Sequence, residues 1–370
     1  MKAIKIGNRV EIYNDTVRTF DALPPKTYMV RFAKMSGFYL EEYTDIAVNE
    51  EKVYGGQLEK ARKVIAAYQR FDRNLGVILS GDKGIGKSLF ARLLAVRAVG
   101  QGIPVLVVDQ YIVGIASYLA GVDQRVMLLF DEFDKTFGGI KPPEGAPEPQ
   151  TEMLGLFDGI SQGKKLFVIT CNEIRHLNDC IINRPGRFHY HFRFDYPSEA
   201  EIRSYLMDKL EKEYYDEIDA IVEFSRKVDL NYDCLRAIVL EVNSGEHFNT
   251  AIQDLNILNL VHDKYDLAVH FENEVVIGAQ DVEIDFFSQE QKTVDISEDN
   301  YHEVISVHFY TQDCEYDIQN QYAFIPAKKL KFTYDEDYEI ELVNRMKALI
   351  PEYLTIKKVR EKSLHYAVSG

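Results

Sequence analysis

The sequence predicts an α/β fold built on a parallel sheet, and three patterns indicate it. Between residues 75 and 172, short apolar runs alternate with segments of helical period. The apolar runs are continuous, which is typical of parallel strands covered by helices on both faces. After residue 196 the segments become amphipathic and helical, which predicts a smaller helical subdomain behind the core.

The first 48 residues are expected to form an N-terminal β-rich segment. They contain two stretches, NRVEIYND and KTYMVRFAKMSGFYLEEY, that are rich in β-branched and aromatic residues. Between these stretches lies LPPK, which is a turn signal. Short strands are therefore expected on both sides of this turn.

Residues 49–196 are expected to form the α/β core. A first helix is expected after the break at Gly55-Gly56, because the apolar residues of QLEKARKVIAAYQRF keep helical spacing. The expected strands are GVILS, PVLVVD, RVMLLFDE and KLFVITCN, and the expected helices are KSLFARLLAVRAV, YIVGIASYLAG and TEMLGLFDGI. The Gly- and Pro-rich stretch FGGIKPPEGAPEPQ predicts a long exposed loop, which at this length favours a functional role.

Two domains are expected after the core. Residues 197–268 predict a small helical subdomain, and Pro197-Ser198-Glu199 is a good helix start signal. Residues 269–370 predict an acidic α+β domain. Its expected strands are NEVVIGAQDVEIDFF, HEVISVHFY and KLKFTYD, and its expected helix, DYEIELVNRMKALI, stops at Pro351.

The charge of the chain bounds its partners. The 370 residues carry a formal charge of -16, and residues 271–370 hold 20 acidic against 10 basic side chains, a net of -10. Such a chain lacks the broad basic footprint of a non-specific DNA-binding protein. No signal peptide is visible and no apolar run approaches about 18 residues, so no membrane association is expected. The four cysteines are interpreted as reduced thiols of a cytoplasmic protein.

The stretch GDKGIGKS predicts a phosphate-binding loop. Its glycines let the backbone point several N–H groups at one anion, and the next helix adds its positive N-terminal end. Lys87 is expected to reach the β and γ phosphates of a nucleotide, and Ser88 to ligate Mg²⁺. The alternative is a glycine-rich turn with a solvated lysine. The residues expected at the nucleotide are Gly81, Asp82, Lys83, Gly84, Ile85, Gly86, Lys87, Ser88 and Leu89.

The stretch VMLLFDE predicts a second part of the same site. A buried strand that ends in Asp131 and Glu132 places two carboxylates at the carboxyl edge of a parallel sheet, where ligands bind. Asp131 is expected to hold Mg²⁺ through water, and Glu132 to act as general base toward the attacking water. Alone, such a run can be a plain strand end.

These motifs together resemble those of the AAA+ ATPases, and of the AAA clade in particular. The segment LLFDEFDK looks like a Walker B motif, and FVITCNEIRHLNDCIINRPGRFHYHFRFDYPS resembles the second region of homology of that clade. The resemblance covers residues 50 to 245. It implies a P-loop NTPase core with a helical lid over residues 197–268, an ATP and Mg²⁺ site, and assembly into a homo-oligomeric ring, usually a hexamer.

The resemblance also implies roles for three further residues. Asn172 matches the sensor 1 residue, whose amide aligns the attacking water or touches the γ-phosphate. Arg184 and Arg187 match the arginine fingers, which the family supplies from a neighbouring subunit and which neutralise transition-state charge. The alternative is that these arginines form local salt bridges.

Three further matches each have a plain structural alternative. Tyr111 to Gly114 correspond to the aromatic–hydrophobic–Gly pore loop, and the alternative is a core position. Arg236 corresponds to a sensor 2 arginine, where the AAA clade often has Gly-Ala instead, or is a surface residue. Val53, Tyr54 and Gly55 correspond to the adenine contact, or to a plain loop.

The expected function is that of an ATP-hydrolysing ring motor that remodels or threads a macromolecule, with a protein substrate favoured over DNA. One alternative is a DNA-linked motor or loader, with Lys135, Lys141, Lys164 and Lys165 in or near loops that face the channel. Another is a scaffold that ATP locks together. The compact length and appended domains favour a bacterial or phage origin.

Overall fold

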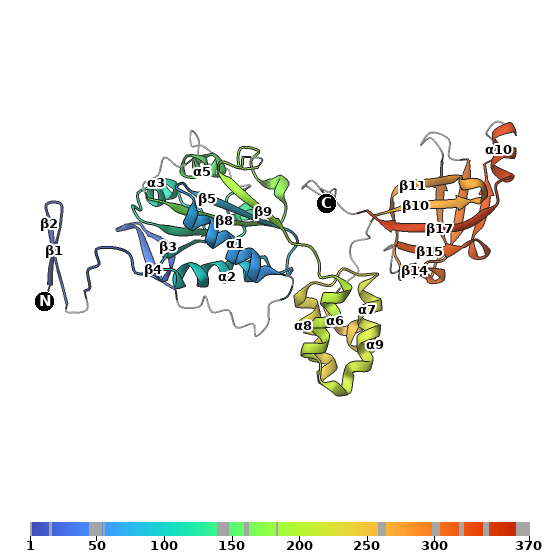
Figure 1. Ribbon diagram of the computed structural model, residues 1–370, viewed down its shortest axis with the longest axis horizontal. Helices are drawn as coiled ribbons and strands as arrows, with labels where there is room; N and C mark the ends of the chain where they lie inside the picture. The colour runs from blue at the N-terminus through green and yellow to red at the C-terminus, as the bar shows by residue number, and fades with distance from the viewer. Residues whose placement is uncertain are drawn as a thin grey trace. The chain divides into compact units, whose positions relative to one another are not determined.

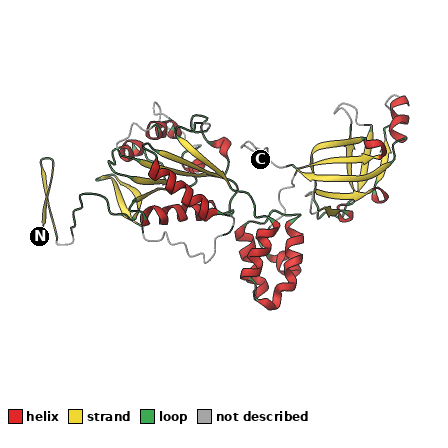
Figure 2. Ribbon diagram, viewed as in Figure 1, coloured by secondary structure: helices red, strands yellow, loops and turns green. Residues whose placement is uncertain are grey.

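The computed structural model describes most of the chain in two compact units, residues 1–255 and 256–370. Figures 1 and 2 show the elements of each unit, which are treated separately here. The described residues are 2–14, 17–43, 54, 56–138, 148–158, 163–182, 184–257, 264–297, 304–317, 322–335 and 340–359.

A seven-stranded sheet forms the centre of the first unit, in the order β4-β3-β6-β7-β8-β5-β9. All neighbours are parallel except β3 and β4, which are antiparallel. This confirms the predicted α/β class with a parallel core. The strands are β3 (Thr27–Ala33), β4 (Gly37–Glu42), β5 (Leu75–Ser80), β6 (Val105–Val108), β7 (Val126–Phe130), β8 (Lys165–Cys171) and β9 (Phe188–Arg193).

Helices cover both faces of this sheet, as Figure 1 shows. One face packs against α1 and α2, and the other against α3, α4 and α5. Every residue of the four central strands, β5 to β8, is buried, which explains their continuous apolar sequences. The helices are α1 (Gln57–Arg70), α2 (Lys87–Gly100), α3 (Ile115–Ala120), α4 (Phe133–Thr136) and α5 (Pro149–Phe157).

The N-terminal segment contributes to the core. Strand β3 pairs with β6 through Thr27, Tyr28 and Met29, and Met29 and Tyr28 face opposite apolar clusters. Part of the segment expected over residues 1–48 is therefore continuous with the core sheet. Strands β1 (Lys2–Ile6) and β2 (Arg9–Tyr13) pair only with each other within the described residues.

Four α-helices follow β9 and pack together. Ser198 starts the first of them with a reciprocal capping box to Glu201, as its start signal predicted. Asn231 caps the third by accepting a hydrogen bond from the backbone of Cys234 at 2.8 Å. The helices are α6 (Glu199–Lys209), α7 (Ile218–Ser225), α8 (Tyr232–Asn243) and α9 (Phe248–Asp254).

The second unit has two antiparallel sheets around one core. The first has the order β11-β10-β17-β15-β14 and the second β12-β13-β16. The elements are β10 (Lys264–Phe271), β11 (Val276–Glu283), β12 (Lys292–Ile296), β13 (Ile305–Phe309), β14 (Glu315–Asp317), β15 (Tyr322–Pro326), β16 (Lys331–Tyr334), α10 (Ile340–Lys347) and β17 (Pro351–Lys358). Among the described residues, no helix of either unit has the length and apolar character that crossing a membrane requires.

Candidate nucleotide site

The expected site residues lie at the carboxyl edge of the central sheet. Strands β5, β7 and β8 are parallel neighbours, so the loops after Ser80, Phe130 and Cys171 come together there. These loops, with the first helix turn after β7 and the lid, line a cavity of about 540 Å³. The lining residues from the different segments include Asp82, Lys83, Asp134, Asn172, Tyr196 and Asn231.

The loop between β5 and α2 has the geometry of an anion cradle. Gly84 and Gly86 have φ of 74° and 98°, in the left-handed region that favours glycine. A Cβ on Gly84 would lie 2.6 Å from the Asn231 amide nitrogen, so a larger residue would displace the Asn231 side chain. Helix α2 starts at Lys87 with no side-chain cap and no acidic residue in its first turn. Its first N–H groups are therefore open to an anion.

Lys87 is folded back onto this loop. Its ammonium donates to the carbonyls of Gly81 and Asp82, both at 2.5 Å, and to Asn172 Oδ1 at 3.1 Å. The side chain is only 8% exposed, and burial lowers its pKa. A buried ammonium beside open backbone donors suits an anionic ligand that replaces these carbonyls.

One hydroxyl joins the Asp131 carboxylate to the backbone of Glu132 after β7. Thr170 on β8 donates to Asp131 Oδ1 at 2.6 Å and accepts a hydrogen bond from the Glu132 backbone at 2.8 Å. Glu132 has φ 47°, which is unusual for a residue other than glycine. Its carboxylate is half-exposed and forms an ion pair with Lys135.

Asp134 ties the end of β8 to the start of α4. Its Oδ2 accepts hydrogen bonds from the backbone N–H groups of Asn172 at 2.9 Å and Glu173 at 3.4 Å. The side chain is 8% exposed, and its Oδ1 is buried without a hydrogen-bond partner. The backbone N–H of Asn172, the expected sensor residue, is thus hydrogen-bonded to Asp134, and its side chain accepts a hydrogen bond from Lys87.

These residues fit a nucleotide with a divalent cation. Within the described residues, two buried side-chain oxygens lack partners, and both lie near the cradle: Asp134 Oδ1 at the cavity and Gln57 Oε1, whose amide approaches Gly86. Unpaired buried oxygens of this kind are rare in folded proteins and indicate a missing donor or ion. The Asp131 carboxylate and Ser88 hydroxyl supply oxygen ligands, which Mg²⁺ prefers.

The two expected finger arginines differ in environment. Arg187 is 11% exposed and forms a bidentate ion pair with Asp158, with Nη2 to Oδ2 at 2.5 Å. It also donates to the carbonyl of Cys180. Arg184 is exposed, and within the described residues its side chain has no hydrogen bond or ion pair. Only Arg184 therefore offers an uncommitted guanidinium, and the finger roles stay predictions.

The expected adenine and sensor 2 residues lie at the lid. Tyr54 packs against two lid tyrosines, Tyr205 and Tyr232, and donates to Asp208 at 2.9 Å. Val53 and Gly55 lie outside the described residues. Arg236 has a 62% exposed side chain and pairs with Asp233 at 3.4 Å. Asn231 lines the cavity instead, so the role of Arg236 stays a prediction without a contact to support it.

The segment expected as a pore loop is partly anchored. Tyr111 packs against Phe137 and donates to Glu152 at 2.6 Å, which also accepts from the Gly114 backbone. Val113 is 60% exposed. The ring of Tyr111 is half-buried against the apolar core and Val113 is exposed, and the pore-loop role of this segment stays a prediction.

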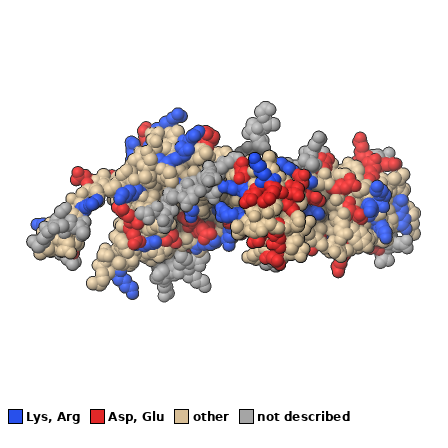
Figure 3. All heavy atoms as spheres, turned by 90° about the horizontal axis from the view of Figure 1, so that it is seen from below, with Lys and Arg blue, Asp and Glu red and all other residues tan. Residues whose placement is uncertain are grey.

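Of the four lysines considered for a DNA channel, the three that the structure describes are each committed to a partner. Lys165 is fully buried and donates to the carbonyl of Val122, so it cannot line a channel. Lys164 donates to the carbonyls of Tyr68 and Phe71 at the end of α1. Lys135 pairs with Glu132, and Lys141 lies outside the described residues. On the face drawn in Figure 3, the described acidic and basic side chains are interspersed in small groups.

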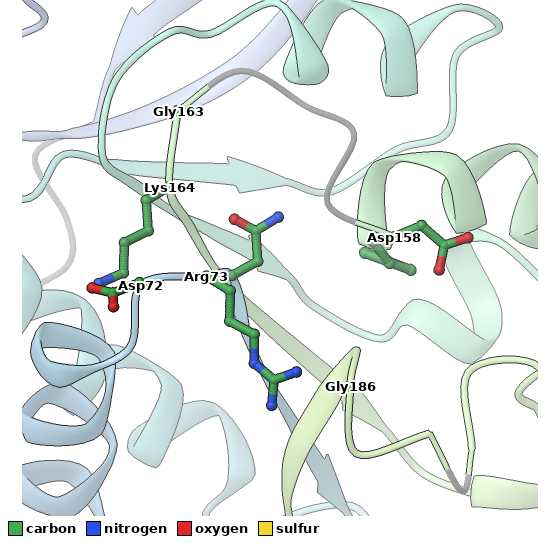
Figure 4. Close-up of a pocket in the computed structure, with 8 residues that line it drawn as sticks. Asp72, Arg73, Asp158, Gly163, Lys164 and Gly186 are labelled. Carbon is green, nitrogen blue, oxygen red and sulfur yellow. The ribbon is translucent and has the colours of Figure 1, made fainter.

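A second cavity, of about 450 Å³, lies at the amino ends of β5 and β8, the edge opposite the phosphate loop. Figure 4 shows Lys164 extending toward Asp72, and Arg73 extending toward Gly186. Its lining mixes both charges, and Lys164 is committed to the carboxyl end of α1. The cavity lacks the convergent backbone donors of the first one, so we assign the nucleotide to the first.

Sequence reasoning missed three residues at the candidate site. Thr170 appeared only as part of an apolar strand, and Asp134 only as part of the motif LLFDEFDK. Asn231 donates to the carbonyl of Lys83 at 3.3 Å, and the Tyr232 backbone donates to the carbonyl of Gly84 at 3.1 Å. The helix start at Asn231 was readable, but its contact with a loop 148 residues earlier was not.

Comparison with known proteins agrees with this geometry. Residues 77–196 match the model of the family described as "ATPase family associated with various cellular activities (AAA)". An ATPase family AAA domain-containing protein of Arabidopsis thaliana is 29% identical over 150 residues, which is 36% of this chain and 12% of that protein. The ATP-dependent zinc metalloprotease FtsH of Aster yellows witches'-broom phytoplasma is 28% identical over 185 residues, which is 44% of this chain and 27% of that protein. The chain thus covers less than a third of each relative.

Proposed function

We propose that the protein, whose residues 77–196 match the AAA family of ATPases, is a Mg²⁺-dependent ATPase that works as a homo-oligomeric ring on a macromolecular substrate. The observation that carries the proposal is the hydrogen bond from Lys87 to Asn172, which lines the cavity at the sheet edge, with Asp131 following the neighbouring strand β7. In this proposal the three residues serve as phosphate-binding lysine, metal-binding carboxylate and γ-phosphate sensor, which hydrolysis of a nucleoside triphosphate requires.

Each residue has a defined task in this proposal. Lys87 exchanges its loop carbonyls for the β and γ phosphates, and Glu132 leaves Lys135 to accept a proton from the attacking water. Asn172 orients that water, and Ser88 and Asp131 hold the cation. Bound Mg²⁺ supplies positive charge to the β and γ phosphates.

The proposed assembly into a ring rests on the arginines. Arg184 is exposed and has no partner among the described residues, which suits a guanidinium that reaches a neighbour's nucleotide. A ring of six, cytoplasmic location and a bacterial or phage origin remain parts of this proposal. The relatives named above come from a plant and a phytoplasma.

We favour a protein substrate over DNA. One relative is by its name an ATP-dependent metalloprotease, which acts on protein. Lys164 and Lys165 are committed to backbone carbonyls, so the two lysines cannot supply the basic lining that a DNA channel needs. The DNA-linked motor and the ATP-locked scaffold are the outcomes that would replace this proposal.

A Glu132→Gln variant tests the chemistry. It should bind ATP with unchanged affinity and hydrolyse it about 100-fold or more slowly, because it keeps the shape but loses the base. Phosphate release and equilibrium binding of a fluorescent ATP analogue measure the two effects. Hydrolysis at the wild-type rate would remove Glu132 as the base.

The substrate class is tested on the wild type and on the same variant. ATPase rates are measured with unfolded protein, single-stranded DNA and double-stranded DNA, and stimulation by unfolded protein is expected. Stimulation by DNA alone would favour the DNA-linked motor. A rate that no polymer changes would favour the scaffold.

A further inference from the structure

Thr170 lies between the two residues that carry the carboxylates of the proposed reaction. It is 1% exposed, on a strand whose other residues are also buried. Its hydroxyl accepts a hydrogen bond from the Glu132 N–H at 2.8 Å and contacts Asp131 Oδ1 at 2.6 Å.

The direction of these hydrogen bonds is fixed by chemistry. A backbone N–H can only donate, so the Thr170 oxygen accepts from Glu132. An ionised carboxylate can only accept, so the one hydroxyl proton of Thr170 goes to Asp131. The result is a chain of hydrogen bonds from Glu132 N–H through Thr170 to Asp131, in which each bond polarises the next.

This chain supports a backbone conformation that costs energy. Glu132 has φ 47° and ψ 50°, a left-handed conformation that is unfavourable for a residue other than glycine. The hydroxyl pairs the N–H of this strained residue and so favours the conformation that directs the Glu132 side chain. It also takes one oxygen of Asp131, which limits rotation of that carboxylate.

Packing alone does not require a hydroxyl at this position. Thr170 is set in an apolar strand, where valine has nearly the same shape and similar strand propensity. Both hydrogen-bond partners of the hydroxyl lie at the edge of the sheet. They are Asp131, the proposed metal-binding residue, and Glu132, the proposed base. The polar group is therefore explained by the site and not by the core.

We propose that Thr170 is a positioning residue for ATP hydrolysis, which fixes Glu132 as base and Asp131 as metal-binding carboxylate. The inference rests on the proposed function. Thr170 does not touch the reacting atoms in this proposal, and it acts only through its two neighbours.

The test compares Thr170→Val with Thr170→Ser in the full chain. Thr170→Val should bind ATP in the absence of Mg²⁺ as the wild type does, but its kcat should fall about 10- to 100-fold, as is usual when a partner of a metal-binding or catalytic group is removed. It should also need more Mg²⁺ for half-maximal rate. Thr170→Ser keeps the hydroxyl and should recover most of kcat. Thr27→Val, which changes a buried threonine of β3, is the matched control and should leave kcat unchanged.

A crystal structure of nucleotide-free Thr170→Val gives a readout that does not depend on activity. Glu132 is expected to leave the left-handed region, and the Asp131 carboxylate to rotate. An unchanged Glu132 backbone together with wild-type kcat would overturn the inference. So would equal losses in the valine and serine variants, or a loss that follows only the melting temperature.

The two proposals fail in different ways. A folded wild type that hydrolyses no ATP removes the proposed function, and Thr170 then has no reaction to serve. An active wild type with a fully active Thr170→Val variant removes only the role of Thr170.

Discussion

Arg184 and Arg187 are only three positions apart, but their side chains have different surroundings. Arg187 is held by Asp158 and the carbonyl of Cys180, and its side chain is largely buried. Arg184 is exposed at the start of the same turn, where its backbone carbonyl accepts from the Arg187 N–H at 2.8 Å. Arg187 therefore stabilises the turn that presents Arg184.

Alanine variants should separate these two roles. Arg184→Ala should lower kcat about 100-fold or more, because a finger arginine is worth orders of magnitude in rate, and should leave the melting temperature unchanged. Arg187→Ala, in contrast to Arg184→Ala, should lower the free energy of unfolding by about 1 to 3 kcal/mol, since it leaves the Asp158 carboxylate unpaired. Calorimetry and ATPase assays measure both. A destabilised Arg184→Ala with an unaffected Arg187→Ala would reverse the assignment.

In our proposal, hydrogen bonds within the protein hold the ammonium of Lys87 in place before the nucleotide binds. Its three hydrogen-bond partners are Gly81, Asp82 and Asn172, so none of its protons is left without an acceptor. Since the same ammonium is to reach phosphate, binding must replace these acceptors. In our proposal, the side chain of Asn172 is released in that exchange, so nucleotide binding at the loop would be coupled to the sensor residue.

At the scale of elements, helix α8 connects the lid to the phosphate loop. Asn231 accepts from Cys234 to cap the helix and donates to the carbonyl of Lys83. One amide side chain therefore both starts a lid helix and touches the cradle. Movement of the loop on nucleotide binding is expected to pull directly on α8.

Two substitutions distinguish the cap from the contact. Asn231→Ala should lower the free energy of unfolding by about 1 kcal/mol, because it loses the cap. Asn231→Ser keeps a capping oxygen but cannot reach as the amide does, so stability should recover while ATP binds about 3- to 10-fold more weakly, the value of one hydrogen bond. Melting curves and equilibrium ATP binding give the two numbers. Equal ATP affinity in Asn231→Ser and wild type would show that the contact does not serve binding.

Elements with strong local signals were predicted well. The apolar runs of β5 to β8 and the helix after GDKGIGKS follow from composition and period alone, and the structure has them at the expected places. The role of β3 was not predictable, because a buried strand has the same sequence pattern whether it joins the core sheet or a separate one. In the second unit, β14 has only three residues, too few for any periodic signal.

The site was predictable where its residues are local in sequence. Lys87 and Ser88 follow the cradle directly, and Asp131 and Glu132 end one strand, so spacing alone identifies them. Thr170 is 38 residues from Glu132 and has the strand propensity of its neighbours, so nothing local marks its hydroxyl. The positive φ of Glu132 is likewise set by tertiary contacts.

At the scale of the whole molecule, the two units have separate cores. Residues of the first unit form two apolar clusters around the sheet, and a third cluster belongs entirely to the second unit. Because ATP binds only one unit in our proposal, its stabilising effect should be confined to that unit.

Calorimetry of the full chain should therefore show two unfolding transitions. ATP with Mg²⁺ should raise the temperature of only one, since a ligand at about 100 times its Kd stabilises the folded state by about 2.7 kcal/mol. The Lys87→Ala variant is the control, and ATP with Mg²⁺ should shift neither of its two transition temperatures. A single transition that moves as a whole would mean that the units unfold together.

The assembly is tested by mixing inactive variants. A Lys87→Ala subunit lacks the cradle ammonium but keeps Arg184, and an Arg184→Ala subunit has the converse defect. If each nucleotide lies between two subunits, random mixing at equal amounts makes about a quarter of the interfaces complete, and activity should return toward that fraction.

The control for that experiment mixes Lys87→Ala with Glu132→Gln. Lys87 and Glu132 lie at the same edge of the sheet in one chain, on α2 and after β7, so no interface can combine a good copy of each from different subunits. This pair should stay inactive at every ratio. A guanidinium contributed by the neighbouring subunit makes the two mixtures behave differently. If the control mixture regains activity, or if the mixture with Arg184→Ala does not, then Arg184 does not act across subunits.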